Sequence, residues 1–216
     1  MANKFSRKSN DLAPCRRAFL LGASALALTG CSNLIGPLNA SQIYVLRPAR
    51  EAAATSGDKI AWALAIDIPD APESLSTNRI ALSQTDTTLD YYANATWPDL
   101  LPNLVQTAIL SGFENNGRID SVSREQDALK ADYVLSTDIR NFEAHYSQPN
   151  GAPNAVVTIV AHMAQSRSRK IVANITTTQS VPASANNLDA VVEAFDTALA
   201  AAVSAIIQWA LVLPSP

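Results

Sequence analysis

The chain has 216 residues, 48% of them apolar, and carries 16 basic and 19 acidic side chains for a net charge of −3. This length and apolar content are enough for one domain with its own core. The acidic balance argues against nucleic-acid partners and against bulk electrostatic binding to anionic lipid, because both require a basic surface.

The N-terminus has the order of a lipoprotein signal peptide, residues 1–30. Basic residues precede an apolar segment, 19–28, of about ten residues, half of what a membrane-spanning helix needs. It leads into Leu28-Thr29-Gly30-Cys31, which resembles the bacterial lipobox, whose cysteine is acylated before the signal peptide is removed. We therefore predict lipidation of Cys31 with palmitate-type chains and lasting attachment to a membrane. A plain signal peptide with an ordinary cysteine is the alternative.

Two features near the predicted lipidation site indicate the membrane to which the protein is sent and the route by which it is exported. Ser32 follows the cysteine where an aspartate favours retention in the inner membrane, so the resemblance implies the outer membrane, with the domain facing the periplasm. The inner membrane stays open as the alternative. Arg16 and Arg17 are similar to a twin-arginine export signal, or they merely supply the positive charge of an ordinary signal peptide.

Removal of the signal peptide would leave a more acidic chain without disulfides. Residues 1–30 hold five basic residues and one acidic residue, so 11 basic and 18 acidic residues remain, a net charge of −7. The two cysteines, Cys15 and Cys31, lie within and directly after the signal peptide, so no intramolecular disulfide is expected. With His145 and His162 as the only histidines, we expect no metal site and no cofactor.

The mature chain divides into a lipidated tether, residues 31–42, and one domain, residues 43–216. Four strands are expected at the start of this domain: residues 43–46, 62–68, 80–83 and 88–92. The third and fourth of these strands should form a hairpin. Alternation within the second strand predicts that Ile68 shares a buried face with Trp62.

A helix should follow this hairpin. Thr96 is predicted to cap it, the helix to propagate from about Pro98, and Asn116-Gly117 to end it. Pro102 is compatible only with the first turn.

Next come a brief strand, residues 119–123, and a long one, residues 133–146. The apolar alternation of the long strand changes phase, with Ile139 on one face and Phe142 on the other. That phase change indicates a β-bulge between the two residues.

The last part of the chain predicts a hairpin and a helix. Residues 154–165 are apolar on both faces, typical of a central strand, and pair through the polar turn 166–169 with the half-exposed strand 170–181. Residues 188–211 form an amphipathic helix that docks on the sheet, and its acidic residues argue against a membrane span. Together the elements predict an α+β two-layer domain, two long helices packed on a mixed or antiparallel sheet.

No motif points to catalysis. Ser83 and Ser111 lie outside any Gly-x-Ser-x-Gly sequence, and neither His145 nor His162 has neighbours typical of an acyl-transfer triad. A glycine-rich phosphate loop is also absent. We therefore predict that the protein is not an enzyme.

Two tryptophans have two interpretations each. Trp97 stands at the start of the first helix and Trp209 at the end of the second. Either they anchor the core and the helix ends, or they mark a surface used by a partner.

Several short segments follow the lipobox in a set order, and the order is more specific than any single piece. They are Tyr44-Val45-Leu46, Asn78-Arg79-Ile80, Leu89-Asp90-Tyr91-Tyr92-Ala93, Trp97-Pro98-Asp99-Leu100-Leu101, Ala131-Asp132-Tyr133-Val134-Leu135, Phe142-Glu143 and Trp209. This order resembles the ABC-type transport auxiliary lipoproteins, a family that includes the lipoprotein of the paraquat-inducible system. The likeness covers most of the mature chain.

Members of that family accompany ABC transporters with mammalian-cell-entry (MCE) domain subunits, which move phospholipid or other hydrophobic molecules between the inner and outer membranes. The resemblance implies a non-catalytic docking component whose partners are the MCE subunit, the permease and the ATPase. It transfers a defined role to Cys31 alone. A structural or assembly lipoprotein of another envelope complex is the alternative, and a lipid or cell-wall hydrolase is disfavoured because no nucleophile motif is present. The oligomeric state, a homo-oligomer included, stays open.

Overall fold

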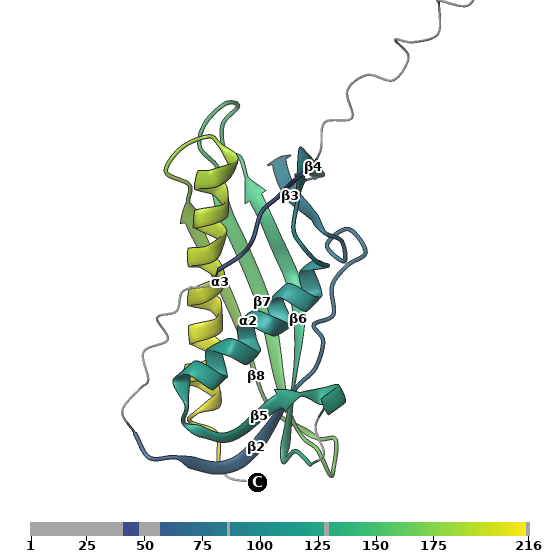
Figure 1. Cartoon of the computed structure of the whole chain (residues 1–216), viewed down its shortest axis with the longest axis vertical. Coiled ribbons are helices and arrows are strands. Elements are labelled where there is room, and N and C mark those ends of the chain that lie inside the picture. Colours follow the sequence, from purple (N-terminus) through teal and green to yellow (C-terminus); the bar gives the residue numbers. More distant parts are fainter. Residues whose placement is uncertain (1–40, 48–56, 86, 128–129, 215–216) are drawn as a thin grey trace, which may run out of the picture. The chain divides into compact units, whose positions relative to one another are not determined.

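The structure of the protein is a computed structural model that describes residues 41–47, 57–85, 87–127 and 130–214 (Figure 1). The predicted signal peptide, Cys31 and nearly all of the tether lie outside these residues. In chain order the elements are β1 (Gln42–Ile43), β2 (Ile60–Ile66), β3 (Arg79–Thr85), β4 (Thr88–Thr96), α2 (Leu101–Asn116), β5 (Ile119–Arg124), the short 3₁₀ helix η1 (Glu125–Asp127), β6 (Tyr133–His145), β7 (Asn154–Gln165), β8 (Ile171–Pro182) and α3 (Leu188–Ala210).

The sheet is organised around β6. One edge of β6 pairs antiparallel with β7, and β7 pairs in turn with the half-exposed β8, as the sequence predicts. The other edge is shared, because β2 runs parallel to the beginning of β6 and β3 runs parallel to its end. β5 extends the sheet beyond β2, while β4 and β1 extend it beyond β3. The result is an open eight-stranded mixed sheet, which confirms the predicted α+β class.

Both long helices cover one face of this sheet (Figure 1). α3 packs on β7 and β8, and α2 packs on β5, β2 and α3. The two helices approach closely at Gly112, where an added Cβ would lie 2.6 Å from Cγ1 of Val203. By length and composition α3 could cross a membrane, but 61% of its apolar window is buried inside the domain. It is the core helix that the sequence predicts.

β6 carries the predicted bulge, and its effect differs from the expectation. The register against β7 shifts between Ile139 and Asn141. Phe142 and Ala144 are nevertheless buried, as Ile139 is. The expectation that Phe142 takes the opposite face is therefore wrong, because the extra residue of a bulge reverses the alternation and returns the later side chains to the core.

The first long helix begins later than predicted. Thr96 does not cap it, because Thr96 is the last residue of β4 and its carbonyl accepts a hydrogen bond from the Tyr44 amide at 2.8 Å. The Leu101 amide donates to the carbonyl of Thr77, which holds the intervening residues as a loop. The helix starts at Leu101, and Pro102 falls in the first turn, where no amide proton is needed.

Other boundaries differ by a few residues. The strand expected at 43–46 is reduced to the short β1, and β2 ends early, so that Ile68 is 46% exposed rather than buried. The cause is local, since the Asp67 carboxylate accepts a hydrogen bond from the Ile68 amide at 2.8 Å and Pro69 follows. At the end of α2 the prediction is correct, because Gly117 adopts a left-handed φ of 68° there.

An aromatic cluster lies at the centre of the core. The rings of Phe142, on β6, and Phe195, on α3, stack with centroids 4.8 Å apart. Trp97 meets both of them edge-on, at 6.3 and 5.8 Å. Offset-stacked and edge-to-face contacts are the favoured geometries for such rings. The cluster therefore ties the loop before α2 to the sheet and to α3.

Candidate functional site

The two tryptophans have different surroundings. Trp97 is 1% exposed between the sheet and α3, so it offers no surface to a partner, and the hypothesis of a docking patch there is wrong. Trp209, in the last turn of α3, is partly buried and packs against the core. Part of the Trp209 side chain remains exposed to solvent, so contact between Trp209 and a partner protein stays a proposal.

The structure brings one serine and one histidine together without forming a catalytic site. Ser83 Oγ lies 3.0 Å from His145 Nδ1, because β3 runs beside the end of β6. Ser83 is only 3% exposed, and within the described residues no carboxylate pairs with the His145 ring. A nucleophile requires both access and an oriented base, so this pair is a buried structural hydrogen bond.

His162 lies on the open face of the sheet, away from the helices. Its Nε2 is 3.9 Å from Asp138 Oδ2, and that oxygen accepts a hydrogen bond from Arg140 at 2.7 Å. The three groups lie together on the surface. Ser136 is the cross-strand partner of His162 on the same face, but among the described residues no hydrogen bond joins their side chains. In the part of the chain that the structure describes, His, Cys, Asp and Glu side chains form no cluster able to hold a metal ion.

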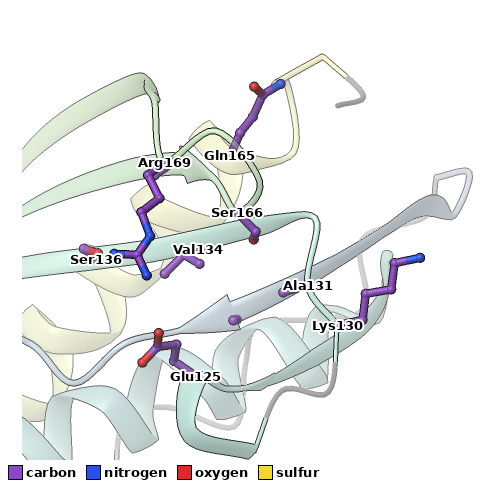
Figure 2. A pocket seen from close by; sticks show the side chains of 10 residues that line it. Glu125, Lys130, Ala131, Val134, Ser136, Gln165, Ser166 and Arg169 are labelled. Atoms are coloured by element: carbon purple, nitrogen blue, oxygen red, sulfur yellow. The ribbon is translucent and has the colours of Figure 1, made fainter.

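A cavity of about 420 Å³ lies on the same open face, where β2, β6 and the β7–β8 turn meet (Figure 2). Its floor consists of small apolar side chains: Ala65, Ala131, Val134 and Ala164. Its rim is polar and comes from η1, the loop before β6, β6 itself, the end of β7 and the turn: Glu125, Lys130, Ser136, Gln165, Ser166 and Arg169. The cavity thus combines an apolar base with charged walls.

Two opposite charges stand on the walls of the cavity. In Figure 2 the Arg169 guanidinium reaches over Val134, and the Glu125 carboxylate approaches from the other side. Neither group forms an ion pair or a side-chain hydrogen bond with another described residue. Lys130 stands on the rim with its ammonium pointing away. Ser166 Oγ is buried and has no hydrogen-bond partner among the described residues.

Backbone hydrogen bonds hold the turn in place. The Arg169 amide donates to the Gln165 carbonyl at 2.8 Å, and Arg169 adopts a left-handed φ of 53°. The Ser166 amide donates to the Asp132 carbonyl at 3.0 Å. The Asp132 carboxylate in turn accepts from the Ala63 amide on β2, also at 3.0 Å. The turn is therefore fastened to both β6 and β2.

No sequence pattern predicts this cavity. Residues 166–169 are predicted only as a polar turn, and no motif gives Glu125 a role. One local feature is informative, an arginine at the end of a hairpin turn, where glycine or asparagine adopts a left-handed conformation at lower cost. The opposite wall comes from a segment far away in the sequence, so no local pattern contains it.

Comparison with known proteins establishes the class. Residues 44–207 match the family described as the ABC-type transport auxiliary lipoprotein component. The match covers most of the chain, and the protein belongs to this family. It is therefore an auxiliary lipoprotein of ABC-type transport with a membrane-anchored location in the envelope, and the family is not a known enzyme family.

Individual proteins are similar to this chain in sequence or in fold. An uncharacterised protein of Bradyrhizobium diazoefficiens is 30% identical over 146 residues, which are 68% of this chain but 38% of that protein. Protein XCC0632 of Xanthomonas campestris has a similar solved structure, with a TM-score of 0.73 and 26% identity over 79% of this chain and 95% of its own. A second solved structure has a TM-score of 0.63 at 12% identity, covering 79% of this chain and 99% of its own, which is a likeness of fold alone.

Proposed function

We propose that the protein is a non-catalytic docking component of an ABC transporter with MCE-domain subunits, which moves phospholipid or other hydrophobic molecules between the inner and outer membranes. In this proposal acylated Cys31 holds the domain on the outer membrane, facing the periplasm. The observation that carries the proposal is the family match over residues 44–207. It follows directly on the segment that resembles a lipobox and on the predicted tether.

The non-catalytic part of the proposal is supported by the buried Ser83–His145 pair. Ser83 Oγ is covered by protein and the ring that it contacts has no orienting carboxylate among the described residues. The protein is thus proposed to act through binding.

The tether limits where binding takes place. An extended chain spans at most about 3.6 Å per residue, so residues 31–42 let the domain stand no more than about 40 Å from its membrane. The far membrane is then reached only through a partner that extends toward the domain. This geometry favours a docking role at one end of a larger assembly.

Self-association is part of the proposal, and β8 is the element that supports it. This strand runs for 12 residues without a charged side chain. Among the described strands it pairs only with β7. Long uncharged edges readily pair with further strands, so β8 is the edge through which copies would meet.

Affinity purification from envelopes tests the proposal. The full-length protein, tagged after Pro216, is purified from detergent-solubilised envelopes, and co-purifying proteins are identified by mass spectrometry. We expect an MCE-domain protein to co-purify together with a permease and an ATPase. The mass of the purified complex then gives the number of copies of the lipoprotein in it. Recovery of a different envelope complex instead would favour the alternative, a structural or assembly lipoprotein.

A further inference from the structure

Residues 41–47 form a strap between the predicted tether and the body of the domain. In Figure 1 this segment runs from beside β4 to α3. The Tyr44 amide donates a hydrogen bond to the Thr96 carbonyl, at the end of β4, at 2.8 Å. Further along, the Arg47 amide donates to Asp196 Oδ1 on α3 at 2.6 Å. The strap therefore bridges β4 and α3.

Burial in the strap alternates but is shallow. Tyr44 and Leu46 are half-buried and pack against the core, whereas Ile43 and Val45 are 62% and 49% exposed. None of the seven residues of the strap is fully buried. A segment with few buried side chains opens at a lower free energy than the core beside it.

The core next to the strap has contacts of its own. Trp97 follows Thr96 in the chain and meets the rings of Phe142 and Phe195, and all three side chains are at most 1% exposed. The Trp97 amide donates to the Asn78 carbonyl at 2.7 Å. None of these contacts involves the strap, so its release leaves them in place.

We infer that the strap is a releasable clamp on the membrane tether: it opens while the rest of the domain stays folded, and its opening lengthens the reach of the anchored domain. With the strap closed, residues 31–42 span at most about 40 Å. Release adds residues 43–47, which extend by at most about 18 Å more. The reach rests on the proposed acylation of Cys31, whereas the opening does not.

Hydrogen exchange of single amides tests the opening, measured by NMR on the full-length lipidated protein in detergent. The amides of Tyr44 and Arg47 should exchange at least about tenfold faster than the Trp97 amide. Low denaturant should accelerate exchange at Trp97 alone, because local opening exposes little surface. Equal rates, or the same dependence on denaturant at all three amides, would overturn the inference.

Variants on α3 test whether the strap opens as one unit. Asp196→Ala removes the acceptor of the Arg47 amide and should speed exchange at Tyr44, on the β4 side, about tenfold. Asp196→Asn keeps an oxygen acceptor and should restore most of the protection. Glu193→Ala, which removes a neighbouring exposed carboxylate of α3, is the control and should change nothing at Tyr44. An unchanged rate at Tyr44 in Asp196→Ala would contradict a clamp that opens as a whole.

A disulfide between the strap and β4 locks the clamp. Ile43 and Thr96 are paired residues of the parallel strands β1 and β4, and the spacing of paired strands, about 5 Å, suits a disulfide. In the double variant Ile43→Cys/Thr96→Cys the two new thiols have no competitor, because Cys15 belongs to the predicted signal peptide and Cys31 is the predicted acylation site. The single variant Ile43→Cys is the control.

Pulling on single molecules then tests the reach. The lipidated protein in a supported phosphatidylcholine bilayer is stretched with magnetic tweezers through a tag after Pro216. Wild type and Ile43→Cys should show a first extension at low force, before the domain unfolds, and the oxidised double variant should lack it until the disulfide is reduced. Identical traces for the oxidised and reduced double variant would overturn the clamp. A protein that does not attach to the bilayer would contradict the acylation of Cys31 and with it the reach, while the exchange measurements still decide the opening.

Discussion

Single residues of the core contribute stability by filling space between distant elements. Trp97 is the clearest case, because it touches Phe142 on β6 and Phe195 on α3. We expect Trp97→Ala to lower the free energy of unfolding by about 3–5 kcal/mol, measured by denaturant titration. Leu100→Ala, at a neighbouring position that is 45% exposed, is the control and should cost far less. An unchanged stability in Trp97→Ala together with lost partner binding would restore the interface hypothesis.

Asp196 on α3 predicts a pH dependence. Burial raises the pKa of Asp196, while the Arg47 amide, 2.6 Å from Oδ1, and the charge of Arg47 act to lower it. A raised pKa means that the folded state binds the proton more tightly, so this contribution to stability is complete below about pH 4 and is lost as the pH rises through the raised pKa.

The neutral variant Asp196→Asn keeps an oxygen acceptor for the Arg47 amide and removes the charge. We expect a higher melting temperature than wild type at pH 7 and a similar one near pH 3, followed by circular dichroism. A variant that is destabilised equally at both pH values would show that the hydrogen bond outweighs the burial of the charge.

At the scale of elements, the crossing of α2 and α3 depends on a missing side chain. A Cβ at Gly112 would lie 2.6 Å from Cγ1 of Val203 and 3.0 Å from Cδ1 of Ile207. Gly112→Ala should therefore destabilise the domain by about 1–3 kcal/mol through overpacking, although alanine is the better helix former. Glu114→Ala, on the exposed side of α2, should change stability by less than about 0.5 kcal/mol. A stabilised Gly112→Ala variant would show that the helices separate without cost.

Element boundaries were predictable where the signal is local. Gly117 ends α2 through its own backbone conformation, and the phase change in β6 indicated its bulge. The prediction that Thr96 caps α2 was wrong. The residues that follow Thr96 are typical of a helix start, but the Tyr44 amide donates a hydrogen bond to the Thr96 carbonyl and holds Thr96 in β4. A partner so distant in the sequence leaves no trace in the pattern around the residue itself.

At the scale of the whole molecule, attachment to the membrane is expected to be separable from folding. Cys31→Ala should move the protein from the membrane fraction to the soluble fraction with an unchanged melting temperature, because the predicted acylation site precedes the domain. Cys15→Ala, within the predicted signal peptide, is the matched control and should stay in the membrane fraction. Metabolic labelling with palmitate checks both variants. A Cys31→Ala protein that is still labelled and membrane-bound would refute the lipobox.

The sequence alone determined the α+β class, most elements and the family, because hydrophobic periodicity, turn residues and short motifs are local properties that the chain shows without folding. Only the tertiary structure decided that Trp97 lies in the core, that Ser83 meets His145, and that Arg169 faces Glu125 across a cavity. The reason is physical. Periodicity specifies which face of an element is buried, but the sheet order around β6 decides which distant side chains become neighbours.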